Sequence, residues 1–164
     1  MTGKEKDDMP LKPFLVSEVM TPDPIVIESD LPLAEVERLM EEHNVRRLPV
    51  LEDGRLVGII SKGDLREARM AELASRHPYE PVDKGSWLTV AEAMTSPVIT
   101  VTPQAPLVEA ARLMLEHKIG GLPVMEFGQL VGILTDTDII CLLVKETLSD
   151  EEPNPLADSE PAGG

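Results

Sequence analysis

An internal repeat constrains this chain more than any other feature of its sequence. The segment GIISKGD, which begins at Gly58, returns as GILTDTD at Gly132, 74 positions later. The same offset, without a gap, also pairs Met20-Thr21 with Met94-Thr95 and Leu48-Pro49-Val50 with Leu122-Pro123-Val124. Each copy is too short to bury a generous core alone, so two copies packed against each other are expected in a chain of 164 residues. The repeat predicts one compact two-repeat module.

The apolar pattern changes in the same order within each copy. A helical face is expected in both, formed by Leu33, Val36, Leu39 and Met40 and by Leu107, Ala110, Leu113 and Met114. Apolar runs on both sides of Asp53-Gly54 predict a two-strand hairpin, and the second copy has an equivalent pair of runs. Second helices are expected from about Asp64 to Ser75 and from Asp138 to Thr147.

A short helical turn ending in Met-Thr and an extended segment precede this pattern in each copy, and Pro32 suits the first turn of the helix that follows. The fold class is therefore α/β (α+β), with the order strand, helix, strand, strand, helix written twice.

The boundaries follow from changes in composition. Repeat 1 is expected over residues 14–76 and repeat 2 over 88–147, joined by a connection at 77–87 that is rich in Pro, Gly and charge. Tyr79 and Trp87 are expected to pack this connection onto the module. Residues 1–13 and the acidic residues 148–164 have the composition of disordered ends.

Charge and hydropathy narrow the cellular setting. The formal net charge of −15 argues against a broad footprint for nucleic acid or an anionic membrane, although a local basic pocket is compatible with it. No apolar run approaches about 18 residues, and the first ten residues lack a signal-peptide core, so a soluble, cytoplasmic protein is expected. Cys141 lies in the apolar run DIICLLV, which favours a buried and inert thiol.

The motifs MT, LPV, LVGI and S/T-x-x-D occur twice, in order and in register. Together they resemble a tandem cystathionine β-synthase (CBS) domain pair, also called a Bateman module, over approximately residues 14–147. The resemblance implies two repeats packed about a pseudo-twofold axis, with two symmetric clefts between them. In many family members these clefts bind adenosine compounds, among them AMP, ADP, ATP, S-adenosylmethionine, NAD and cyclic dinucleotides.

Two interpretations fit Ser61-x-x-Asp64 and Thr135-x-x-Asp138. Each motif stands where a strand gives way to a helix, so it predicts a capping box. A carboxylate at a helix start can also accept hydrogen bonds from a ribose diol, while free N–H groups there suit phosphate. The two roles are compatible, and the resemblance implies the ligand-binding one.

The resemblance implies further ligand-binding residues. Thr21 and Thr95 match a threonine that contacts the nucleoside, whereas Ile25, Val26, Ile99 and Thr100 match positions that enclose adenine; Thr137 joins the candidates from the second S/T-x-x-D motif. Thr21 and Thr95 could instead terminate a helical turn, and the apolar residues could be plain core. Pseudo-symmetry groups Thr21 and Ile25 with Thr135 and Asp138 in one cleft, and Thr95 and Ile99 with Ser61 and Asp64 in the other.

The copies differ most in charge. Arg46-Arg47 becomes Gly120-Gly121, and Lys62 becomes Asp136. Arginine and lysine side chains suit phosphate oxygens. We therefore expect the cleft with Ser61, Lys62 and Asp64 to prefer a phosphorylated ligand and the other to be weaker, more adenosine-like or empty. Ordinary surface charges are the alternative explanation.

The sequence indicates no enzyme, since it contains no Gly-rich phosphate loop, zinc-ligand spacing or nucleophile elbow. His43 and His117 fall at equivalent helix ends, which favours a structural role over metal binding. The leading function is a stand-alone regulatory sensor that binds an adenine nucleotide (AMP, ADP or ATP), needs no resident cofactor and signals to an unidentified regulated protein. The alternative is a scaffold or dimerisation module without a ligand. The resemblance implies a homodimer for either version, because family members pair through their helices.

Overall fold

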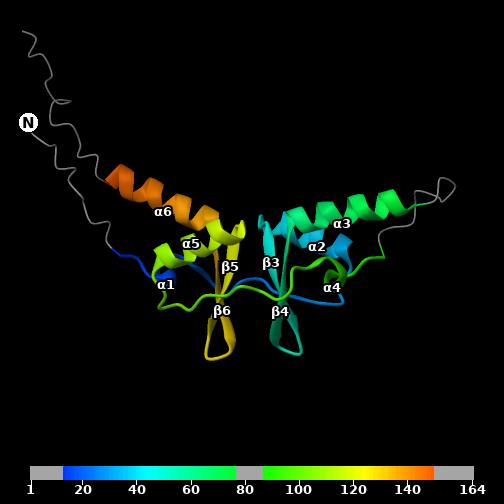
Figure 1. The fold of residues 1–164 in the computed structure, drawn as a ribbon, viewed down its shortest axis with the longest axis horizontal. Coiled ribbons are helices and arrows are strands. Elements are labelled where there is room, and N and C mark those ends of the chain that lie inside the picture. Colours follow the sequence, from blue (N-terminus) through cyan, green and yellow to red (C-terminus); the bar gives the residue numbers. More distant parts are fainter. Residues whose placement is uncertain (1–12, 77–86, 150–164) are drawn as a thin grey trace, which may run out of the picture.

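The computed structural model describes residues 13–76 and 87–149, in which two similar halves lie side by side (Figure 1). The disorder expected for residues 1–13 and 148–164, and most of the expected connection, lie almost entirely outside the described residues. Residues 148 and 149 belong to the last helix, so the disorder expected from residue 148 is wrong at these two positions. The α/β class and the pseudo-twofold pair of repeats are confirmed.

Repeat 1 contains the predicted order of elements. Strand β2 (Ile27–Glu28) is parallel to β3 (Arg47–Glu52), which is antiparallel to β4 (Arg55–Ser61). Helix α2 (Leu33–Glu42) joins β2 to β3, and helix α3 (Lys62–Ser75) follows β4 directly. The second helix thus begins two residues before the expected Asp64.

Repeat 2 follows the same plan with a shorter first strand. Helix α5 (Leu107–His117) precedes the hairpin of β5 (Gly121–Glu126) and β6 (Gln129–Thr135), and α6 (Asp136–Ser149) comes last. The expected strand ahead of α5 is reduced to one parallel bridge between Val101 and Val124.

Local sequence accounts for the helix starts and hairpin bends. Asp53 and Gly54 both have positive φ, 49° and 74°, as a type I′ turn requires. Phe127 and Gly128 repeat this geometry at the second bend, with φ of 48° and 77°. Pro32 is the N-cap of α2, one position ahead of the expected first turn. The buried face of α2 consists of Leu33, Val36 and Met40.

The leading segment of each repeat crosses to the other repeat. Helix α1 (Val16–Val19) precedes β1 (Thr21–Pro22), and β1 pairs with β6 of repeat 2 so that Thr21 lies opposite Ile133. Helix α4 (Val90–Ala93) precedes Thr95, which forms the equivalent bridge to Ile59 of repeat 1. The two halves are therefore interleaved.

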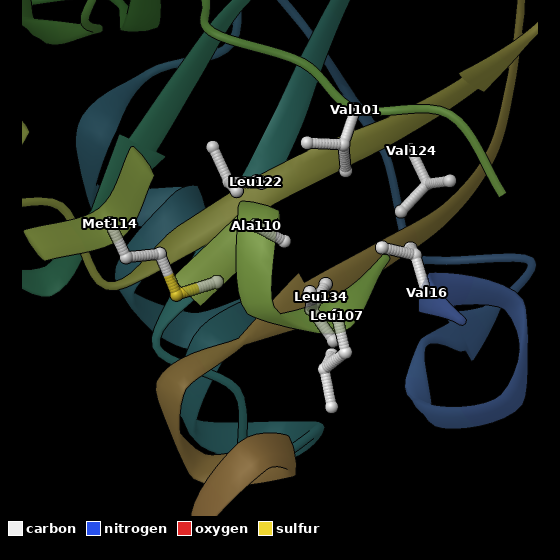
Figure 2. Packing of buried hydrophobic residues seen from close by; sticks show 8 residues of the cluster. All are labelled: Val16, Val101, Leu107, Ala110, Met114, Leu122, Val124 and Leu134. Atoms are coloured by element: carbon white, nitrogen blue, oxygen red, sulfur yellow. The ribbon is translucent and has the colours of Figure 1, made fainter. Parts of the chain in front are cut away.

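The two hydrophobic cores show the same exchange. Val16 of α1 is fully buried among side chains of repeat 2, including Leu107 and Leu134 (Figure 2). The Val16 N–H donates to the Ala105 carbonyl at 2.9 Å, which fixes α1 against the segment before α5. Val90 of α4 is likewise buried in the core of repeat 1. Each core is closed by a helix from outside its own repeat.

Two predictions about burial were wrong. Cys141 is exposed on α6, and Trp87 is 81% exposed rather than packed onto the module; Tyr79 lies outside the described residues. Cys141 is exposed because α6 covers its sheet with one face and leaves several apolar side chains uncovered on its outer side. Helices α3 and α6 lie along one side of the molecule, away from the hairpin bends (Figure 1). Among residues 13–76 and 87–149, no helix combines the length and apolar character needed to cross a bilayer.

Candidate ligand-binding pocket between the repeats

A pocket of about 600 Å³ opens between the two repeats. Its volume falls within the range of roughly 300–1,000 Å³ that is typical of small-molecule sites. Eight of the candidate ligand-binding residues line it: Thr21, Ile25, Arg46, Arg47, Lys62, Thr135, Thr137 and Asp138. Thr21 and Ile25 thus share a cavity with Thr135 and Asp138, as pseudo-symmetry predicts.

The crossing of β1 builds this pocket. Because Thr21 pairs with Ile133, the residues that follow β1 run past the end of β6 and the start of α6. Gly132 permits the crossing, since a Cβ there would lie 3.0 Å from the Thr21 carbonyl oxygen. The glycine of the repeated GI motif is therefore a point of close approach between the repeats.

A capping box holds Asp138 at the start of α6. Its Oδ2 accepts hydrogen bonds from the Thr135 N–H at 2.8 Å and from the Thr135 hydroxyl at 2.9 Å. The Asp138 N–H in turn donates to Thr135 Oγ1 at 3.3 Å. Oδ1 accepts no hydrogen bond from the described residues. Capping and ligand binding are therefore sterically compatible, because capping uses one carboxylate oxygen and leaves the other available.

The prediction that N–H groups are free at the start of α6 was wrong. The Asp136 N–H donates to the Gly120 carbonyl at 3.0 Å, and the Thr137 N–H donates to Asp136 Oδ1 at 2.8 Å. With the Asp138 N–H bound to Thr135, the first three amide donors of α6 all have partners. An anion in this pocket would therefore depend on side-chain cations.

Three cations line the pocket, and their placement corrects the expected charge of the clefts. Arg46, Arg47 and Lys62 accompany Thr135 and Asp138, not Ser61 and Asp64. Arg47 opens β3, Lys62 opens α3, and the Lys62 N–H donates to the Arg46 carbonyl at 2.9 Å. The start of β3 and the start of α3 therefore lie next to each other and face the T-x-x-D motif of repeat 2 across the pocket. Lys62 therefore does not belong to the same cleft as the Ser61 and Asp64 that flank it in sequence.

Arg47 also extends over the first strand of the repeat 2 hairpin. A Cβ at Gly121 would lie 2.7 Å from Arg47 Cδ, and one at Gly120 would overlap the guanidinium group. Arg47 Nη1 lies 3.5 Å from Asp136 Oδ1, and the two side chains are 19% and 52% exposed. Arg47 and Asp136, two residues whose charge differs from that of their repeat counterparts, thus contact each other.

The comparison with known families agrees with this architecture. The model of the CBS domain matches residues 16–71 and residues 90–145, which together make up more than half of the chain. The chain belongs to the CBS domain family. It contains a tandem CBS pair, and the pocket lies between the two CBS domains.

Relatives and solved structures share the pair. A CBS domain-containing protein of Dictyostelium discoideum is 33% identical over 133 residues, which cover 80% of this chain and 92% of the relative. The CBS domain pair of protein MJ0100, solved with 5′-methylthioadenosine and S-adenosyl-L-methionine, has a TM-score of 0.71 at 28% identity, with coverage of 82% and 99%. CBSX2, solved in complex with AMP, has a TM-score of 0.67 at 30% identity, with coverage of 82% and 98%.

The remaining candidate residues of the CBS pair lie outside this pocket lining. Ser61 and Asp64 form a capping box, in which Asp64 Oδ2 accepts from the Ser61 N–H and hydroxyl, both at 2.7 Å. Thr95 is bound to Ile59 through two backbone hydrogen bonds of 3.1 and 2.8 Å, and Ile99 packs against the core of repeat 2. Val26 is partly exposed beside the pocket residue Ile25.

Sequence reasoning missed six residues of the lining: Asp23, Pro24, Asn44, Val45, Leu48 and Ile133. Asp23 and Asn44 have positive φ, 47° and 51°, a conformation that Asp and Asn adopt more readily than most residues. In the sequence, an Asp or Asn directly after a predicted helix or extended segment could have indicated these tight bends beside the cavity. Ile133 carried no distinguishing signal, since it occurs in an ordinary strand pattern.

The histidines occupy the predicted helix ends. His43 is the C-cap of α2, and His117 is the last residue of α5. Within the part of the chain that the structure describes, no three His, Cys, Asp or Glu side chains form a group that could hold a metal ion.

Proposed function

We propose that this CBS pair is a regulatory sensor that binds an adenosine nucleotide in the pocket between the repeats. The observation that carries the proposal is the joint presence of Asp138 and the cations Arg46, Arg47 and Lys62 around one cavity. A ribose diol can donate to the carboxylate, and phosphate oxygens can accept from the cations. The pocket therefore matches both polar parts of a nucleotide.

The apolar residues of the pocket lining suit the adenine base of the nucleotide. Ile25, Val45 and Ile133 supply aliphatic surface against which an adenine ring can pack. With Oδ2 of Asp138 engaged by Thr135, Oδ1 is the acceptor available to the ribose. AMP, which carries one phosphate group, is the first ligand to test.

The solved CBS pairs support this choice of ligand class. The MJ0100 pair was solved with two adenosine derivatives and CBSX2 with AMP. In our proposal the chain acts by binding rather than by catalysis. The ligand favours one conformation over another through differential affinity, and a partner protein recognises the favoured surface.

A second candidate function is dimerisation or scaffolding. Its support is the row of exposed apolar side chains on the outer helices: Met70 and Leu73 on α3, and Ile140, Leu143, Val144 and Leu148 on α6. Apolar surface of this kind favours association because it is removed from water in a complex. We propose a homodimer through α3 and α6, which is compatible with nucleotide binding.

A melting-temperature panel with AMP, ADP, ATP, NAD, S-adenosylmethionine, cyclic di-AMP and GTP tests the sensor. A ligand of the folded state at a hundredfold excess over Kd adds about 2.7 kcal/mol to the free energy of unfolding. We expect at least one adenine compound to raise Tm, with a clearly smaller shift in Asp138→Ala. A flat panel would exclude the sensor and leave the scaffold.

A further inference from the structure

The two sides of the interface between the repeats, one with Thr135 and Asp138 and the other with Ser61 and Asp64, differ at the centre of the molecule. Gly121 and Gly120 occupy the repeat positions of Arg47 and Arg46, and the Arg47 side chain lies along both glycines. A side chain at either glycine would collide with Arg47. Arg47 therefore covers repeat 2 positions whose repeat 1 counterparts line the pocket.

The sign of the charge at the first position of the second helix differs between the two sides as well. Asp136 is the repeat counterpart of Lys62, and Lys62 lines the pocket. Pseudo-symmetry therefore gives the side of Ser61 and Asp64 a carboxylate where the pocket has an ammonium group. That carboxylate is the partner of Arg47. The same contact covers the second side with the Arg47 side chain.

We infer that Arg47 and Asp136 restrict the module to one anionic nucleotide per chain, bound on the side of Thr135 and Asp138. This inference rests on the proposed function. Asp136 holds the Arg47 guanidinium over Gly120 and competes with a phosphate group for it. On the opposite side Asp136 stands where the pocket has Lys62, so a second nucleotide lacks that phosphate contact. Asp136 is thus a specificity-determining residue that limits phosphate affinity and the number of sites.

Isothermal titration calorimetry with AMP, and with adenosine as the uncharged comparison, tests the inference on the full chain. The informative variant is Asp136→Asn, which removes the charge and keeps the shape. Its matched control is Asp53→Asn, which makes the same charge change at the hairpin bend, at the far end of β3 from Arg47. Asn tolerates the positive φ at that bend.

We expect one AMP per chain for the wild type. Because exposed or half-exposed ion pairs contribute modestly, Asp136→Asn should raise AMP affinity about two- to fivefold. Adenosine binding should stay unchanged in this variant, and Asp53→Asn should match the wild type with both ligands.

Other results would overturn the inference in distinguishable ways. Two AMP molecules per wild-type chain, or no gain in AMP affinity from Asp136→Asn, would refute it and leave the sensor function intact. An equal gain for adenosine and AMP would show that the effect is not one of phosphate charge. Absence of AMP binding to the wild type would reject AMP as the ligand of this pocket, and this inference with it.

Discussion

Met20 lies against Gly132 of the opposite repeat, so closely that a Cβ at Gly132 would be 2.5 Å from the Met20 sulfur. Met94 meets Gly58 in the same way in the other half. Both residues of this contact belong to the repeated motifs, MT and GI. The repeated MT and GI motifs therefore form the same contact in both halves. At each contact, the segment that begins one repeat packs against the hairpin of the other repeat.

The first prediction concerns that contact. Gly132→Ala forces Met20 or the β1 backbone to move, and overpacking of this kind costs about 1–3 kcal/mol. We expect a lower free energy of unfolding in urea and weaker AMP binding, because Thr21 shifts with β1. Gly63→Ala is the control, since its Cβ would meet only Ser61 Oγ at 3.4 Å. Equal stability of the two variants would contradict the account of the crossing.

The second prediction separates capping from ligand binding. Asp138→Ala and Asp64→Ala each remove one capping box, at a similar cost of about 1 kcal/mol in stability. AMP affinity should fall about tenfold or more in Asp138→Ala, through loss of the ribose acceptor, and much less in Asp64→Ala. Calorimetry on both variants measures this difference. An equal loss would show that the lost capping box, and not a lost contact between Asp138 and the ribose, lowers AMP affinity.

The third prediction concerns the phosphate cations. The double variant Arg46→Ala/Lys62→Ala should lower AMP affinity about tenfold or more and weaken its dependence on salt. Adenosine affinity should change little, because adenosine has no phosphate. Arg55→Ala, at the hairpin end of β4, is the control for loss of a surface cation. A parallel loss for adenosine would mean that the cations shape the cavity rather than bind phosphate.

The fourth prediction tests the proposed dimer. Leu143→Glu puts a charge on the outer face of α6, where Leu143 is 52% exposed. We expect light scattering to show a dimer for the wild type and a monomer for this variant, because burying an unpaired carboxylate is costly. Val108→Glu, on the exposed side of α5, should remain dimeric. A monomeric wild type at micromolar concentration would refute the dimer.

The fifth prediction concerns the exchanged helix α1. Val16→Ala should lower the free energy of unfolding by about 2 kcal/mol, since Val16 is fully buried in the core of repeat 2. Val108→Ala, at a position 68% exposed, should cost far less. Both repeats should unfold in one transition by circular dichroism and by differential scanning calorimetry. Separate transitions would show that the interleaved cores are energetically independent.

Much of the fold could be predicted because the relevant signals are local. The periodic apolar face of α2 and the Asp53-Gly54 bend each depend on a few neighbouring residues. Because the sequence repeats with an offset of 74 residues, these local patterns occur in both repeats and support each other. The grouping of Thr21 with Thr135 came from the family resemblance, because nothing in the sequence around Thr21 indicates that its segment crosses to the other repeat.

The errors arose where contacts over long distances decide the outcome. Lys62 was assigned to the cleft of its sequence neighbours Ser61 and Asp64, yet its position at the first turn of α3 places it beside the opposite motif. Cys141 was expected to be buried because an apolar run indicates a face that avoids water. The run does not say whether the same chain covers that face, and in the described residues Cys141 is exposed.

The docking of α1 has a consequence for the order in which the protein can assemble during synthesis. Helix α1 leaves the ribosome before repeat 2, but its docking site includes Leu107, Leu122 and Leu134 of repeat 2. Helix α1 therefore cannot be buried until repeat 2 has been synthesised, and the contact closes a loop of about a hundred residues, which is slow. The β3–β4 hairpin needs only its own residues and can form early. Helix α1 is thus fixed in place only after the strands and helices of repeat 2 have been made.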